Sequence, residues 1–120
     1  RLKTIFGGSG GKFLPDEFQR GADGCMPACQ FGDILTRVVE FYWNDKKENA
    51  RDLHRKLLPL INLESHSFMR YILKRRGVIT STFERAPSGL QTINEDDKHE
   101  ISILLKTIEE EVEICPFGPE

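Results

Sequence analysis

Residues 4–11 read Thr-Ile-Phe-Gly-Gly-Ser-Gly-Gly, and residues 19–24 read Gln-Arg-Gly-Ala-Asp-Gly. The β-branched and aromatic residues at positions 2–6 predict a short strand that runs into a glycine-rich loop. Between the two stretches, apolar residues recur at helical spacing, and Pro15 suits the first turn of a helix. The small apolar residues 25–29 predict a second buried strand. This part of the chain therefore predicts one strand–helix–strand unit.

Helices are predicted to follow this unit. The first begins at Asp33, which can act as its N-cap, and ends near Asn44, and the second begins at Asp45. The second helix carries an apolar stripe that is expected to pack inward and consists of Ala50, Leu53, Leu57, Leu60 and Ile61.

Two further helices are predicted in the C-terminal half. Residues 67–76 have helical spacing, and the last helix is expected to run as far as Val112. Asn94 and Asp97 resemble a capping box at its start, with Asp in place of the usual Glu. Residues 78–93 contain Pro87 and Gly89 and lack helical periodicity, so they predict an extended connection.

The order of the predicted elements indicates a part of a larger α/β domain. Parallel strands need neighbouring strands and covering helices on both faces, and one strand–helix–strand unit supplies too few of either. The chain is therefore expected to form the end of such a domain.

Composition excludes several classes of function. The 120 residues carry a formal net charge of -2, so there is no basic surplus for nucleic acid. The run Lys74-Arg75-Arg76 is better explained as the cationic last turn of a helix. No apolar run is long enough to span a membrane, and the first six residues are too few and too polar for a secretory signal. A cytoplasmic protein without nucleic-acid or membrane partners is expected.

Metal and phosphate sites are also not favoured. Cysteines 25, 29 and 115 are odd in number and form no CxxC pair, and histidines 54, 66 and 99 have no metal-binding spacing. These histidines are expected on the surface or at the edge of the core. The glycine-rich loop does not match a P-loop, because Phe6 and Phe13 stand where glycine and a hydroxyl residue are needed.

Residues 4–24 resemble the seventh strand, loop and helix of the dihydrodipicolinate synthase and N-acetylneuraminate lyase family of class I pyruvate-dependent aldolases. The resemblance continues through Ala-Arg-x-Leu-His-x-x-Leu-Leu-Pro-Leu at residues 50–60, the helix at 68–77 and Arg-Ala-Pro at 85–87. It implies an α/β fold, the C-terminal portion of a (β/α)8 TIM barrel with strands seven and eight, followed by a helical segment. The implied divisions are residues 1–44 for the barrel, 45–114 for the helical extension and 115–120 for a tail.

The same resemblance implies the chemistry of the parent protein, a lyase that forms a Schiff base with pyruvate or a related 2-oxo acid. The lysine that does this in the family lies on the sixth strand, upstream of this chain, so no catalytic residue is assigned here and the chain alone is expected to be inactive. Lys3 and Lys12 are expected to be solvated. The resemblance also implies a homo-oligomer, and no cofactor or metal is expected.

Three residues are expected to line the substrate pocket, because the active face of a barrel lies at the C-terminal ends of its strands. Gly8 matches the family glycine beside the Schiff base, Ser9 would face the variable part of the substrate, and Met26 would lie near its carboxylate. Several family members have acidic residues where this chain has Ser9-Gly10-Gly11, which leaves the specific substrate open. The alternative is a non-catalytic helical interaction module derived from such a barrel.

Overall fold

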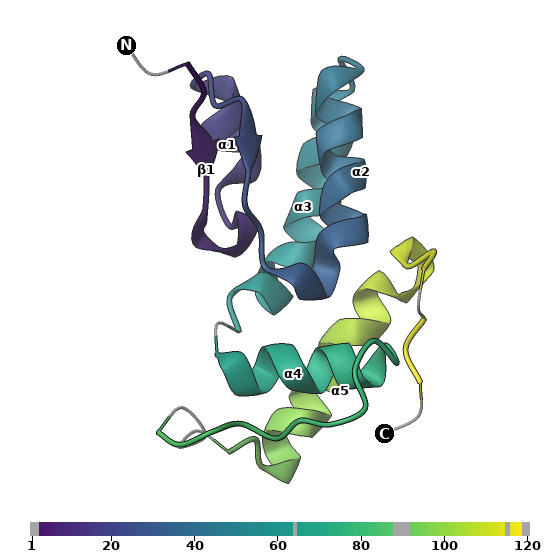
Figure 1. Cartoon of the computed structure of the whole chain (residues 1–120). Coiled ribbons are helices and arrows are strands. Elements are labelled where there is room, and N and C mark those ends of the chain that lie inside the picture. The colour runs from purple at the N-terminus through teal and green to yellow at the C-terminus, as the bar shows by residue number, and fades with distance from the viewer. Residues whose placement is uncertain (1–2, 64, 88–91, 115, 119–120) are drawn as a thin grey trace. The chain divides into compact units, whose positions relative to one another are not determined.

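The computed structural model describes residues 3–63, 65–87, 92–114 and 116–118, which are mostly helical with a small two-stranded sheet (Figure 1). The chain divides into two compact units, Arg1–Asn62 and Leu63–Glu120. Leu2 of the predicted first strand, Gly89 of the predicted connection, Cys115 and the last two residues of the tail lie outside the described residues. The boundary expected at residue 44 separates barrel from extension and stays a prediction.

In the first unit, strands β1 (Phe6–Gly7) and β2 (Gly24–Cys25) pair in parallel, with helix α1 (Leu14–Gln19) between them in the chain. The predicted strand–helix–strand order is therefore confirmed, although each strand has only two residues. Residues 26–28, expected to continue the second strand, have no regular structure and lead into the short helix η2 (Cys29–Phe31). The ladder is short because, among the described residues, each strand has only the other as its partner.

Two long helices, α2 (Gly32–Trp43) and α3 (Lys47–Ile61), lie side by side in the first unit (Figure 1). The predicted N-caps are wrong in detail. Asp33 lies inside the first turn of α2, because η2 runs almost directly into that helix and places Phe31 at the N-cap. Asp45 adopts a positive φ of 59° in the turn between the helices, and Lys46 precedes α3 instead.

The core of the first unit is formed by the facing sides of these helices. The predicted stripe of α3 is confirmed, because each of its five residues is at most 4% exposed. It is complemented by buried side chains of α1 and α2, which are Leu14, Phe18, Ile34, Leu35 and Val38. Burial of these apolar surfaces is the main stabilising contribution to this unit.

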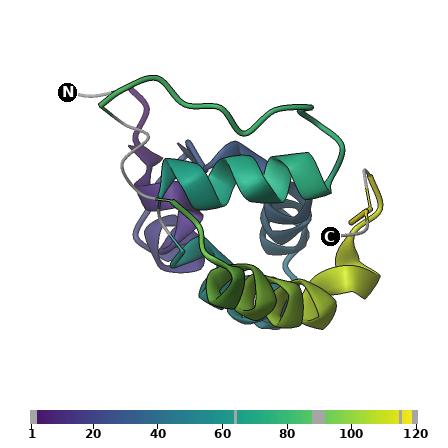
Figure 2. The same ribbon diagram turned by 90° about the horizontal axis from the view of Figure 1, so that it is seen from below.

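The second unit begins with α4 (His66–Arg75), whose N-cap Ser65 accepts a hydrogen bond from the backbone N–H of Phe68 at 3.2 Å. The chain then turns back, and residues 78–87 run along α4 without regular structure (Figures 1 and 2). This agrees with the extended connection predicted for residues 78–93, as far as these residues are described.

Helix α5 (Glu95–Ile108) follows, and its predicted capping box is confirmed. Asn94 Oδ1 accepts from the N–H of Asp97 at 2.8 Å, and Asp97 Oδ2 accepts from the N–H of Asn94 at 3.0 Å. The helix ends earlier than predicted and passes into the short helix η4 (Glu109–Glu111). Three successive glutamates there disfavour a longer α-helix, because the C-terminal end of a helix already carries partial negative charge. The core residues of this unit are Ile72, Ile101, Leu105 and Ile108.

None of the helices in the described ranges has the length and apolar character that a membrane span requires.

Candidate functional site

The loop after β1 is a tight turn built from left-handed residues. Gly8 has φ -144° and ψ -135°, outside the standard helical and extended regions, and the next three residues have φ values of 51° at Ser9, 66° at Gly10 and 89° at Gly11. Two hydrogen bonds close the turn, from Gly11 N–H to the carbonyl of Gly8 at 3.0 Å and from Lys12 N–H to the carbonyl of Ser9 at 3.1 Å. The loop therefore has one well-defined backbone shape.

The parallel pairing brings two of the predicted site residues to the same end of the sheet. Met26 follows β2 directly and donates its N–H to the carbonyl of Gly7 at 2.9 Å, so Met26 lies beside the start of the loop. Its side chain is exposed, with 71% of its surface accessible. Ser9 is also exposed. The structure thus places Gly8, Ser9 and Met26 at the same end of the sheet, and their contact with a substrate stays a prediction.

Gly7 and Gly8 differ in the space beside them. A Cβ at Gly8 would meet nothing within 4 Å, whereas a Cβ at Gly7 would overlap the carboxylate of Glu17 on α1. One oxygen of this carboxylate, Oε2, is buried and has no hydrogen-bond partner among the described residues. Sequence reasoning missed this contact, because no motif singles out Glu17 among the acidic residues of α1.

His54 on α3 reaches the same loop from the helical side. Its Nε2 lies 2.8 Å from the carbonyl oxygen of Gly11, and the residue is 6% exposed. The prediction of a surface or core-edge position is therefore wrong for His54, which is buried with a specific partner. His66 and His99 are exposed, as predicted. The helical spacing of His54 and Leu57 on α3 was the available signal for its burial.

Charged and polar groups near this loop join α3 to α1. Arg51 Nη2 donates to Asp16 Oδ1 at 3.0 Å and to Gln19 Oε1 at 2.8 Å. On β2, burial and, secondarily, the Glu17 carboxylate raise the pKa of the Cys25 thiol above its ordinary value. This environment favours the protonated thiol, so Cys25 is poorly suited to act as a nucleophile.

The two lysines near the loop do not project from the end of a strand. Lys3 is exposed and precedes β1, and Lys12 is half-buried at the C-cap of η1 (Ser9–Gly11). Within the described ranges, no three His, Cys, Asp or Glu side chains are grouped in a way that could hold a metal ion.

The first unit also contains an apolar pocket of about 290 Å³. Its lining comes from α1, β2 and α2 and the residues around them, namely Leu14, Phe18, Asp23, Gly24, Cys25, Pro27, Gly32, Leu35, Thr36 and Val39. It includes none of the three predicted site residues, although Pro27 and Leu35 of its lining also lie beside Gly11 of the loop.

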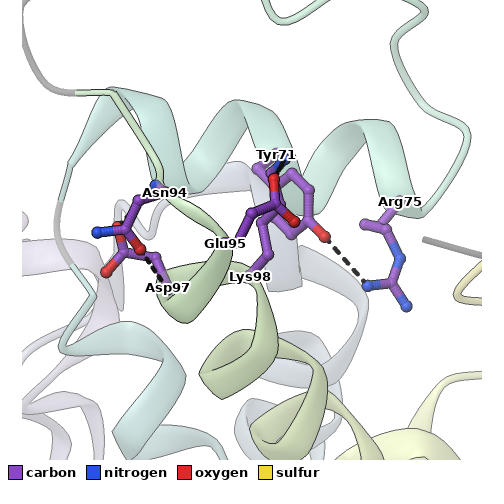
Figure 3. A network of polar contacts seen from close by, with 6 residues as sticks. All are labelled: Tyr71, Arg75, Asn94, Glu95, Asp97 and Lys98. Atoms are coloured by element: carbon purple, nitrogen blue, oxygen red, sulfur yellow. Dashed lines mark hydrogen bonds and ion pairs between the residues drawn. The ribbon is translucent and has the colours of Figure 1, made fainter.

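The second unit contains a more polar pocket of about 330 Å³, which lies between α4, the irregular segment and the start of α5. It is lined by Ser67, Tyr71, Thr82, Glu84, Thr92, Ile93 and Lys98. Figure 3 shows two of these side chains, Tyr71 and Lys98. The hydroxyl oxygen of Tyr71 accepts a hydrogen bond from Arg75 Nη1 at 3.4 Å, and Lys98 lies beside the capping box.

Glu84 is the most buried charged group at this second pocket, with a side chain that is 6% exposed. Its Oε1 accepts from Ser67 Oγ at 3.3 Å and lies 3.5 Å from Arg70 Nε, while its Oε2 is buried without a hydrogen-bond partner among the described residues. Since Oε1 is already engaged and Oε2 is covered, the carboxylate mainly ties the segment to α4.

Comparison with solved structures finds a likeness to a known enzyme. The chain is similar to the crystal structure of a dihydrodipicolinate synthase from Rhodopseudomonas palustris, with 31% sequence identity and a TM-score of 0.76. The likeness covers 87% of this chain and 36% of that chain, so the chain spans little more than a third of the length of this relative. No protein-family model matches, and no curated protein matches either.

Proposed function

This chain resembles the C-terminal part of the dihydrodipicolinate synthase family, and on that premise we propose that it forms strands seven and eight of a (β/α)8 barrel and the helices that follow them. The complete enzyme is a lyase that forms a Schiff base with pyruvate or a related 2-oxo acid. This chain supplies one wall of the pocket, and the lysine that attacks the substrate comes from the part of the barrel before it.

The observation that carries the proposal is the parallel pairing of β1 and β2 within a chain of this likeness. Two strands of two residues each are too short to stand as an independent sheet. Side chains on and around them remain exposed, with Ile5 at 54%, Phe6 at 59% and Met26 at 71%. Further strands and their helices would cover these apolar surfaces, as both faces of a parallel sheet require.

The pocket wall proposed for the substrate is the edge that holds Gly8, Ser9 and Met26. Strands of a barrel present their C-terminal ends to the substrate, and this edge lies at the C-terminal ends of β1 and β2. The open space beside Gly8 lets a planar 2-oxo acid approach the backbone. The hydroxyl of Ser9 can bond an oxygen of the variable part, and Met26 supplies an apolar contact near the carboxylate.

Schiff-base chemistry in the complete enzyme requires a lysine amine that attacks the carbonyl carbon of the substrate and expels water. Neither Lys3 nor Lys12 is proposed for this role, because one precedes β1 and the other follows the loop. The proposal includes a cytoplasmic homo-oligomer that needs no cofactor.

The test is reductive trapping of the complete polypeptide that carries this sequence. With pyruvate and borohydride, mass spectrometry of the digested protein is expected to find a stable pyruvyl adduct on a lysine outside residues 1–120. The 120-residue chain alone, treated in parallel, is expected to remain unmodified. An adduct on Lys3 or Lys12 would contradict the placement of the catalytic strand, and no adduct on any lysine would contradict the function.

The second candidate, a helical interaction module without catalysis, is favoured by one observation. The described residues are mostly helical, and the helices of the second unit have a core of their own around Ile72, Ile101 and Leu105. A gene that encodes no lysine-bearing barrel strands, together with no companion chain that supplies them, would select this candidate over the enzyme.

A further inference from the structure

We propose that His54 is a positioning residue of the enzyme, which holds the loop of Gly8 and Ser9 in its binding shape through the carbonyl of Gly11. The inference rests on the proposed function and deepens it, because it names the group outside the pocket wall that sets the geometry of that wall. His54 lies on α3, 43 positions away from Gly11 in the chain.

The contact has a defined direction. A carbonyl oxygen can only accept, so Nε2 carries the hydrogen and donates it to Gly11 at 2.8 Å. His54 is 6% exposed and Gly11 is also buried, so water does not easily replace either partner. A buried carbonyl that loses its donor costs more than an exposed one, which gives the bond a strong influence on the local backbone.

Gly11 transmits this anchoring to the pocket wall. Its own N–H donates to the carbonyl of Gly8 at 3.0 Å, and the next residue, Lys12, donates to the carbonyl of Ser9 at 3.1 Å. Gly11 has a φ of 89°, and a Cβ added there would lie 3.2 Å from Cδ1 of Leu35. The position is therefore packed from one side and hydrogen-bonded from the other.

The backbone conformation of Ser9 is the reason why the loop needs a stabilising contact. Its φ of 51° belongs to the left-handed region, which a residue with a side chain adopts at an energetic cost. Such a conformation persists where the surroundings hold it. His54 lies between the buried residues Leu53 and Leu57 on α3, so the core holds the helix that carries the imidazole. The ion pair of Arg51 with Asp16 at 3.0 Å adds a further contact between α3 and α1.

The experiment compares three variants of the complete enzyme. His54→Leu removes the donor with little change in volume, and His54→Gln keeps an amide N–H that can reach the carbonyl of Gly11. Leu57→Ala is the matched control, because Leu57 lies on the same helix and is fully buried but makes none of the hydrogen bonds that hold the loop. Hydrogen exchange at the amides of Gly11 and Lys12 is measured together with pyruvate trapping, kcat and KM.

The expected result is faster exchange at both amides in His54→Leu and a fall in kcat/KM of about tenfold to 100-fold, the range that a slightly misplaced binding group produces. His54→Gln should restore both, and Leu57→Ala should lower the melting temperature without either change. Unchanged exchange in His54→Leu would overturn the inference, and so would faster exchange with full activity. If the unaltered enzyme traps no pyruvate, the proposed function fails, and the exchange data decide the anchoring by themselves.

Discussion

The carboxylate of Glu17 occupies the space into which a Cβ on Gly7 would extend. A side chain at Gly7 would therefore force the end of the Glu17 side chain to move, while the neighbouring Gly8 faces open space. The two adjacent glycines have different roles, and a pair of alanine substitutions separates them.

Gly7→Ala is expected to lower the free energy of unfolding by about 1 kcal/mol, the lower end of the usual cost of overpacking, because the atoms that must move are the end of the Glu17 side chain. Gly8→Ala is the control and should be nearly neutral, because its Cβ meets no atom within 4 Å. Chemical denaturation of the complete enzyme measures both. The loss should shrink when Gly7→Ala is combined with Glu17→Ala, and a loss of the same size in that background would show that Glu17 is not the cause.

A larger side chain at Gly8 is expected to act on the substrate instead of the fold. Gly8→Val should leave a folded enzyme whose kcat/KM falls by orders of magnitude and whose lysine no longer traps pyruvate, because a branched side chain fills the space left for the ligand. Steady-state kinetics and circular dichroism provide the two readouts. A folded variant with nearly full activity would reduce Gly8 to a turn residue.

Leu57 on α3 is fully buried, at 0% exposure. Leu57→Ala should cost about 2 to 5 kcal/mol of stability through lost burial and the cavity left behind. The Michaelis constant of the folded fraction should stay nearly unchanged, since Leu57 belongs to the core of the first unit. Thermal unfolding and substrate titration test this, and neutral stability with altered substrate affinity would reverse the assignment.

Burial lowers the pKa of His54 below its ordinary value of 6.5, against the weaker opposing effects of the Gly11 carbonyl and Asp16, and Arg51 lowers it further. A histidine with a lowered folded pKa takes up protons more readily when unfolded, so its contribution to stability is complete above pH 6.5 and is lost as the pH falls through the folded pKa. The stability difference between the wild type and His54→Gln should therefore shrink as the pH falls from about 7 to about 5.5.

Urea denaturation at several pH values measures this difference, and titrating carboxylates contribute equally to both proteins. A difference that grows toward low pH would mean that the imidazole is stabilised in its charged form.

Local residue patterns already determined much of this protein. The stripe of α3 was predicted because apolar residues at helical spacing bury one face, and the capping box of Asn94 and Asp97 was predicted because short-range hydrogen bonds depend on neighbours in the chain. The strand–helix–strand order and the likeness to the aldolase family also followed from residues 4–24. These features depend on contacts within one element or on a motif.

Only the tertiary structure decided which distant groups meet. The strands proved shorter than predicted, because ladder length depends on neighbouring strands rather than on β propensity. The contact of Glu17 with Gly7 and that of His54 with Gly11 join residues of different elements, and no periodicity within α1 or α3 specifies the partner. The positive φ of Asp45 likewise comes from the turn that packs α2 against α3, which placed the helix start at Lys47 instead of at the aspartate.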